Sequence, residues 1–135
     1  MSIVTNEEAK SAMVAYLKTL TTLTSLLASA NEIREVQYQG TEFEYPNVRV
    51  RIIENNPVGT SGCYHKFRIG IQVYSELESS REAEIISGII LEELNDRPFT
   101  QNSLNVIMRI TDVVPALRVD ERTWKSEVLA TAVMS

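Results

Sequence analysis

The sequence has few of the residues on which metal and redox chemistry most often depend. Its 135 residues include one Cys and one His. Cys63 has no second cysteine to pair with, so the chain predicts no internal disulfide and fits a reducing compartment or one indifferent to redox state. Cys63 and His65 would lie on one side of a strand, but zinc needs three or four ligands, and carboxylates would have to supply the rest. We therefore expect no metal and no cofactor, and interpret His65 as an ordinary strand residue.

Catalytic patterns are also missing. A Cys–His nucleophile needs a third, orienting group and oxyanion donors, and no motif in the sequence supplies them. The Gly-Thr-Ser-Gly segment at 59–62 does not fit a phosphate-binding loop, because no lysine follows it and the next predicted element is a strand. The sequence thus favours a protein that is not an enzyme. A hydrolase dependent on Cys63 and His65 is the enzymatic alternative.

Basic residues and long apolar runs are scarce as well. Thirteen basic against eighteen acidic residues give a net charge of −5, which argues against a protein whose main task is binding duplex nucleic acid. No run reaches the ~18 apolar residues that a membrane span needs, and the first residues lack a signal-peptide pattern. We expect a cytosolic site of synthesis, no membrane partner and, at this length, a single domain over 1–135.

Hydrophobic periodicity predicts two helices and five strands. Capping boxes at Thr5-x-x-Glu8 and Ser79-x-x-Glu82 predict a helix over about 6–28 and a second one that ends at Asn95. Alternating or short apolar segments predict the strands, at 33–38, 48–52, 64–74, 104–110 and 123–134. The order α-β-β-β-α-β-β indicates an α+β fold, in which both helices pack against one face of an antiparallel or mixed sheet. Turn-forming residues at 54–63 predict a loop that becomes ordered on assembly.

Charge is segregated along the chain. Residues 46–74 hold four basic side chains against one acidic, a local charge of +3, whereas residues 75–96 hold one basic against seven acidic, a local −6. Such segregation can make one face of a subunit complementary to another face of its copy, although ordinary solvated faces are the alternative. The candidate interface residues are Arg49, Arg51, Lys66 and Arg68 on the basic side and Glu82, Glu84, Glu92 and Glu93 on the acidic side.

The element order and several local phrases resemble the tail terminator, or tail-completion, proteins of long-tailed bacteriophages. The resemblance extends from about residue 6 to 133, and its phrases are YPNVRV at 45–50, FRIGIQVYS at 67–75, SREA at 80–83, LEEL at 91–94 and RTWKS at 122–126. It implies a structural virion protein that is made in the host cytoplasm and forms a homohexameric ring at the head-proximal end of the tail.

Such a ring caps the tail tube, stops its polymerisation and presents the head–tail joining surface. The implied partners are the subunit itself, the tail tube protein and a head-completion or connector protein, with DNA passing through the lumen without sequence-specific binding. A closed ring needs two different complementary patches on each subunit, and the basic and acidic residues above are the candidates. Two alternatives remain open: the basic face could line the lumen, or the chain could be a small ligand-binding or regulatory α+β module.

Overall fold

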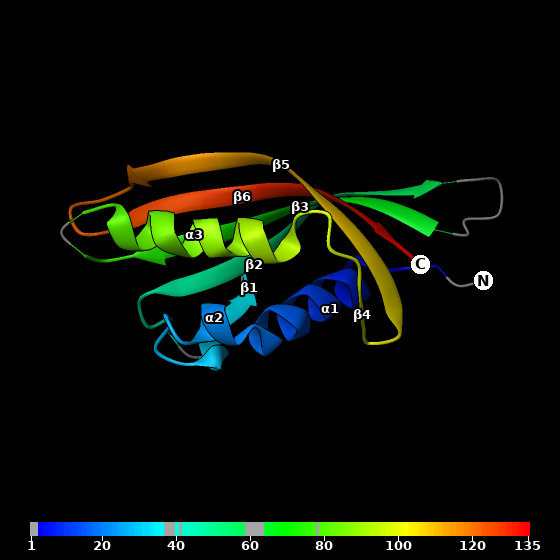
Figure 1. Ribbon diagram of the computed structural model, residues 1–135, viewed down its shortest axis with the longest axis horizontal. Coiled ribbons are helices and arrows are strands. Elements are labelled where there is room, and N and C mark those ends of the chain that lie inside the picture. The colour runs from blue at the N-terminus through cyan, green and yellow to red at the C-terminus, as the bar shows by residue number, and fades with distance from the viewer. Residues whose placement is uncertain (1–2, 37–39, 41, 59–63, 78) are drawn as a thin grey trace.

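The computed structural model describes residues 3–36, 40, 42–58, 64–77 and 79–135 (Figure 1). Its helices are α1 (Asn6–Thr19), α2 (Thr21–Thr24), the 3-10 turn η1 (Ala30–Glu32) and α3 (Arg81–Leu94). Its strands are β1 (Ile33–Glu35), β2 (Asn47–Val58), β3 (Tyr64–Ser75), β4 (Phe99–Gln101), β5 (Leu104–Arg118) and β6 (Trp124–Met134).

The six strands form one mixed sheet in the order β1-β2-β3-β6-β5-β4. β1 runs parallel to β2, and every other neighbouring pair is antiparallel. The predicted α+β architecture is therefore confirmed, with the helices packed against a sheet.

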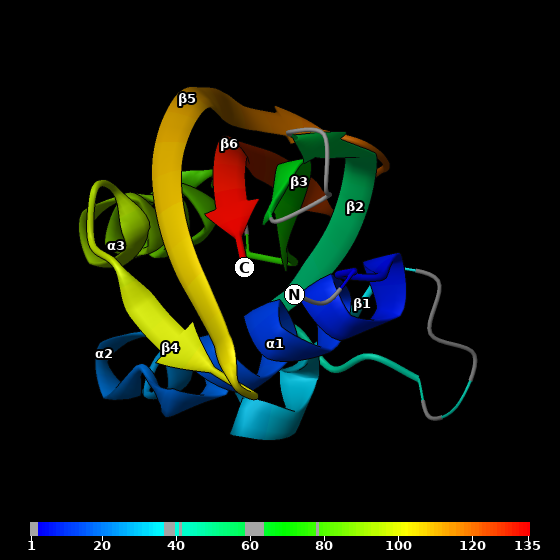
Figure 2. The same cartoon turned by 90° about the vertical axis from the view of Figure 1, so that its right-hand side faces the viewer.

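One face of the sheet holds the core, because alternate residues of each long strand are apolar. From β3 these are Phe67, Ile69, Ile71 and Val73, all fully buried, and they join the apolar sides of α1 and α3 in one cluster. The sheet is strongly curled, as Figure 2 shows, so its two edge strands β1 and β4 both contact α1. Stacking of the Tyr16 and Phe99 rings, with centroids 3.6 Å apart, joins α1 to β4.

Two predicted helix boundaries were wrong. The helix expected over 6–28 ends at Thr19, because Leu20 has an extended backbone and only the short α2 follows it. The Thr5 and Glu8 capping box is present, but the second box is not: α3 begins after Ser80, whose side chain makes no capping hydrogen bond.

Strand boundaries also differ from the prediction. The segment 54–58, expected in a loop, continues β2 and pairs with β3, while 59–63 lies outside the described residues. β4 was missed because its three residues offer too short a pattern. β5 extends through Pro115 to Arg118, which is possible because Pro115 lies at a break in the β5–β6 register, where it need not donate a ladder hydrogen bond.

Candidate assembly surfaces

The four predicted basic residues lie on one face of the sheet, the face opposite the helices. Arg49 and Arg51 of β2 face Gln72 and Gly70 of β3, and further along β3 Lys66 and Arg68 face Asn56 and Glu54. Since directly opposed residues of an antiparallel pair point to the same side, all four cations share this outer face. Their shared placement leaves the interface role a prediction.

Arg51 makes an internal ion pair across the sheet. Its Nε and Nη2 donate to the two carboxylate oxygens of Glu127 on β6, at 2.8 and 3.0 Å. β3 lies between these strands, and the ion pair passes over Gly70, where any added Cβ would overlap both side chains. Arg51 is therefore engaged within the subunit, and Gly70 provides the space for this pairing.

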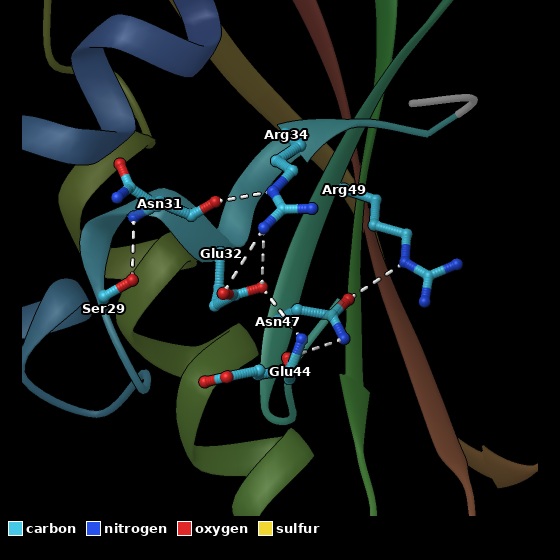
Figure 3. Close-up of polar contacts among 7 residues, drawn as sticks. All are labelled: Ser29, Asn31, Glu32, Arg34, Glu44, Asn47 and Arg49. Atoms are coloured by element: carbon cyan, nitrogen blue, oxygen red, sulfur yellow. Dashed lines mark hydrogen bonds and ion pairs between the residues drawn. The ribbon is translucent and has the colours of Figure 1, made fainter. Parts of the chain in front are cut away.

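Arg49 is also engaged within the subunit. Its Nε donates to Asn47 Oδ1 at 2.9 Å, and Asn47 Nδ2 in turn donates to the carbonyl of Glu44 (Figure 3). The guanidinium lies over two aromatic rings, 4.2 Å from the centroid of Phe43 and 4.0 Å from that of Tyr74. These contacts attach the segment before β2 to the outer face of the sheet, so Arg49 has a structural role.

A buried glutamate supports the same segment. Glu32 is only 5% exposed, and its Oε1 accepts a hydrogen bond of 2.9 Å from the backbone N–H of Glu44. Arg34 Nη2 lies 3.4 Å from the same carboxylate and forms an ion pair with it (Figure 3). Buried carboxylates need such partners, so this network fixes the chain where it enters β2.

Lys66 and Arg68 remain as exposed cations without an internal ion pair among the described residues. The structure adds Arg109, an exposed cation whose Nε lies 4.0 Å from Asp96 Oδ1. Arg68 pairs with Thr131 of β6, which pairs on its other side with Arg109 of β5. Two strand spacings place the backbones of Arg68 and Arg109 about 10 Å apart on the outer face. Sequence reasoning missed Arg109 because its position opposite Thr131 depends on a register that only the assembled sheet defines.

Three of the four predicted acidic residues have partners inside the subunit. Glu82 accepts from the hydroxyl of Ser75, Glu93 from that of Thr22, and Glu84 from the backbone N–H of Ala116 at 2.6 Å. Glu92 is exposed and has no polar partner among the described residues. The acidic residues therefore do not form one uniform free patch.

Glu84 shows what these internal contacts achieve. β5 pairs with β4 only over its first three residues, so most of one edge of β5 lacks a neighbouring strand. Glu84 binds this edge near its end, and Asn95, after α3, accepts from the N–H of Ile110. The two ends of α3 thus occupy backbone groups that could otherwise pair with a strand of another chain.

His65 is a buried strand residue with two polar contacts. Its Nε2 accepts a hydrogen bond from the backbone N–H of Val4 at 3.2 Å, and its Nδ1 lies 2.7 Å from Asn55 Oδ1. These partners assign the proton to Nδ1 and attach the segment before α1 to the β2–β3 hairpin, near the point where β2 ends and β3 begins. Cys63 lies outside the described residues, within which no three His, Cys, Asp or Glu side chains could together hold a metal ion.

An open groove of about 590 Å³ lies beside the start of α3. Three exposed apolar side chains line it, Leu26, Leu77 and Ile85, together with the charged Glu76, Arg81 and Glu82. Nothing in the sequence pattern predicted this groove, since only the fold brings Leu26 next to the segment 76–86. As for membranes, the helices that the structure describes are all too short or too polar to cross one.

Comparisons with known proteins give a fold but no family. No family model matches the sequence, and no curated protein matches it. The structure is similar to a chain from the virion of a native gene transfer agent particle, with a TM-score of 0.70 and 12% identity over 93% of this chain and 92% of that chain. A second solved protein, of no stated function, gives a TM-score of 0.61 and 11% identity over 94% and 90% of the two chains. At these identities the likeness shows a shared fold.

Proposed function

We propose that this protein is a structural component of a phage-like virion, and more specifically a tail terminator. Six copies would form a ring at the head-proximal end of the tail tube, stop the polymerisation of the tube and provide the surface that joins the head. The observation that supports this most is the likeness over nearly the whole length of both chains to a protein of a gene transfer agent virion.

The surface of the subunit agrees with an assembly role. Its exposed apolar side chains lie in separate places, including Leu77 and Ile85 beside α3 and Ile53 on the β2–β3 hairpin. Leu26, Leu77 and Ile85 line one groove, and clustered exposed apolar side chains are typical of surfaces that bind other chains. The proposed role needs no catalytic activity, and the one His of the chain contacts the segment before α1.

Tube polymerisation in vitro tests the proposal. The tail tube protein from the same particle is polymerised with increasing amounts of this protein, and tube lengths are measured by negative-stain microscopy. A terminator should shorten the tubes as its amount rises and should be found at one end of each tube. Tubes whose lengths do not respond, or which bind the protein along their sides, would contradict the proposal.

A further inference from the structure

We propose that the exposed arm of the β2–β3 hairpin of one subunit binds in the groove beside α3 of a second copy. The arm consists of residues 52–58 and 64–68, and the groove is the one lined by Leu26, Leu77 and Ile85. The β3 half of the arm also pairs with β6, so the outer face of the arm is the surface that would bind. This inference deepens the proposed function, because it names the contact through which the subunits would join.

The groove has the properties of a protein-binding site. Leu77 is 54% exposed and Ile85 45% exposed, although both are large apolar side chains. Glu76, Glu82 and Arg81 lie beside them, so two acidic side chains and one basic side chain line the groove. The expected occupant is therefore a segment with exposed apolar side chains and positive charge.

The arm has those properties. A register shift between Ile52 and Glu54 leaves Ile53 without an opposed residue and exposed, and Tyr64 is exposed at the start of β3. Lys66 and Arg68 lie on the outer face of the arm and are exposed. Glu54 lies opposite Arg68, so the arm has two basic side chains and one acidic side chain.

The two surfaces lie at opposite ends of the long axis of the molecule (Figure 1). The hairpin forms one end, and the start of α3, with the segment that joins it to β3, forms the other. One subunit therefore cannot fill its own groove, whereas a row of copies can join arm to groove in one direction. A contact between two different patches is heterologous, and it closes into a ring when the rotation between neighbours is suitable.

Two variants that each lose one surface test the contact. Lys66→Glu with Arg68→Glu reverses the charge of the arm and leaves the groove intact, while Ile85→Glu alters the groove and leaves the arm intact. Leu77→Asp is a second groove variant, at a position outside the helices and strands. Circular dichroism and thermal unfolding verify that each variant is folded, and native mass spectrometry measures its oligomeric state.

The expected results are specific to a heterologous contact. Wild type should form closed rings, and each variant alone should be monomeric. An equimolar mixture of an arm variant with a groove variant should stop at the heterodimer, because only one intact arm and one intact groove can meet. A wild type that is monomeric at all concentrations, variants that still form rings, or a mixture that stays monomeric would each overturn the inference.

A matched pair of charge reversals distinguishes this groove from the rest of the acidic helix. Glu76→Lys, beside the groove, should weaken assembly at least tenfold, and Glu92→Lys, near the other end of α3, should leave it unchanged. The reverse result would assign the contact to another part of α3 and overturn the inference.

Arm variants that still form rings and still shorten tubes would refute the arm contact alone, whereas rings that depend on the arm but leave tube length unchanged would refute the terminator role alone.

Discussion

Gly70 provides the sharpest test of the outer-face geometry, because a single methyl group there should displace an ion pair. The Arg51–Glu127 pair lies over this glycine, with the Glu127 side chain 11% exposed and that of Arg51 40% exposed. Gly70→Ala should therefore destabilise the protein. In an unobstructed strand the same change is favourable, since Gly costs roughly 0.5–1 kcal/mol relative to Ala.

The magnitude follows from the burial of the two charges. Removing one partner of a fully buried ion pair costs about 3–5 kcal/mol, while exposed pairs contribute about 0–1 kcal/mol. Because Glu127 is nearly buried and Arg51 is partly solvated, we expect loss of this pair to lower the free energy of unfolding by about 2–3 kcal/mol. After the favourable effect of replacing Gly, the net loss in the free energy of unfolding should be about 1–2 kcal/mol.

Urea unfolding measures this change, and Gly88→Ala is the matched control. Gly88 lies within α3, and nothing is within 4 Å of an added Cβ there, so alanine should stabilise the protein by about 1 kcal/mol. In a background with Arg51→Ala and Glu127→Ala, Gly70→Ala should become neutral or stabilising. A neutral Gly70→Ala in the wild type, or an equal loss in both backgrounds, would show that the ion pair is not the cause.

Three further substitutions test other contacts. His65→Ala should lower the free energy of unfolding by about 2 kcal/mol, because the Val4 N–H loses its acceptor. Hydrogen exchange at Val4 should accelerate, and unchanged exchange would refute the contact. Arg49→Lys should lower the free energy of unfolding in urea by about 1 kcal/mol, since lysine cannot stack on two aromatic rings as a planar guanidinium does. A variant as stable as the wild type would refute the stacking role of Arg49. Hydrogen bonding to Glu35, and to a smaller extent to Glu7, raises the pKa of Lys10. The contribution of Lys10 to stability is therefore full below its ordinary pKa and is lost as pH rises through the raised pKa. Glu35→Gln should reduce that alkaline loss of stability, and an unchanged pH profile would contradict the contact.

Local patterns predicted the elements whose signal is contained in their own residues. The alternation over 64–74 predicted β3 almost to its ends, and Thr5 with Glu8 fixed the start of α1. The break after Thr19 could not be read from the apolar spacing, because the same leucines continue through the extended Leu20 into α2. Packing of this region against the rest of the protein decides where the helix ends.

The candidate interface was harder to predict because charge alone does not show which side chains are free. Arg49 and Arg51 have the same sequence signal as Lys66 and Arg68, yet the first two are engaged by aromatic rings and by Glu127. These partners come from distant segments, so only the folded sheet reveals them. The groove beside α3 also depends on the fold, which brings Leu26 next to the segment 76–86.

The most direct test of the proposed role is cryo-electron microscopy of isolated tails that contain this protein. The account predicts a ring of six copies at the head-proximal end of the tube, with the curled six-stranded sheet recognisable in each copy and each β2–β3 arm lying against the α3 groove of its neighbour. Density for the protein at the other end of the tail or along its length, or no ring at all, would contradict the account.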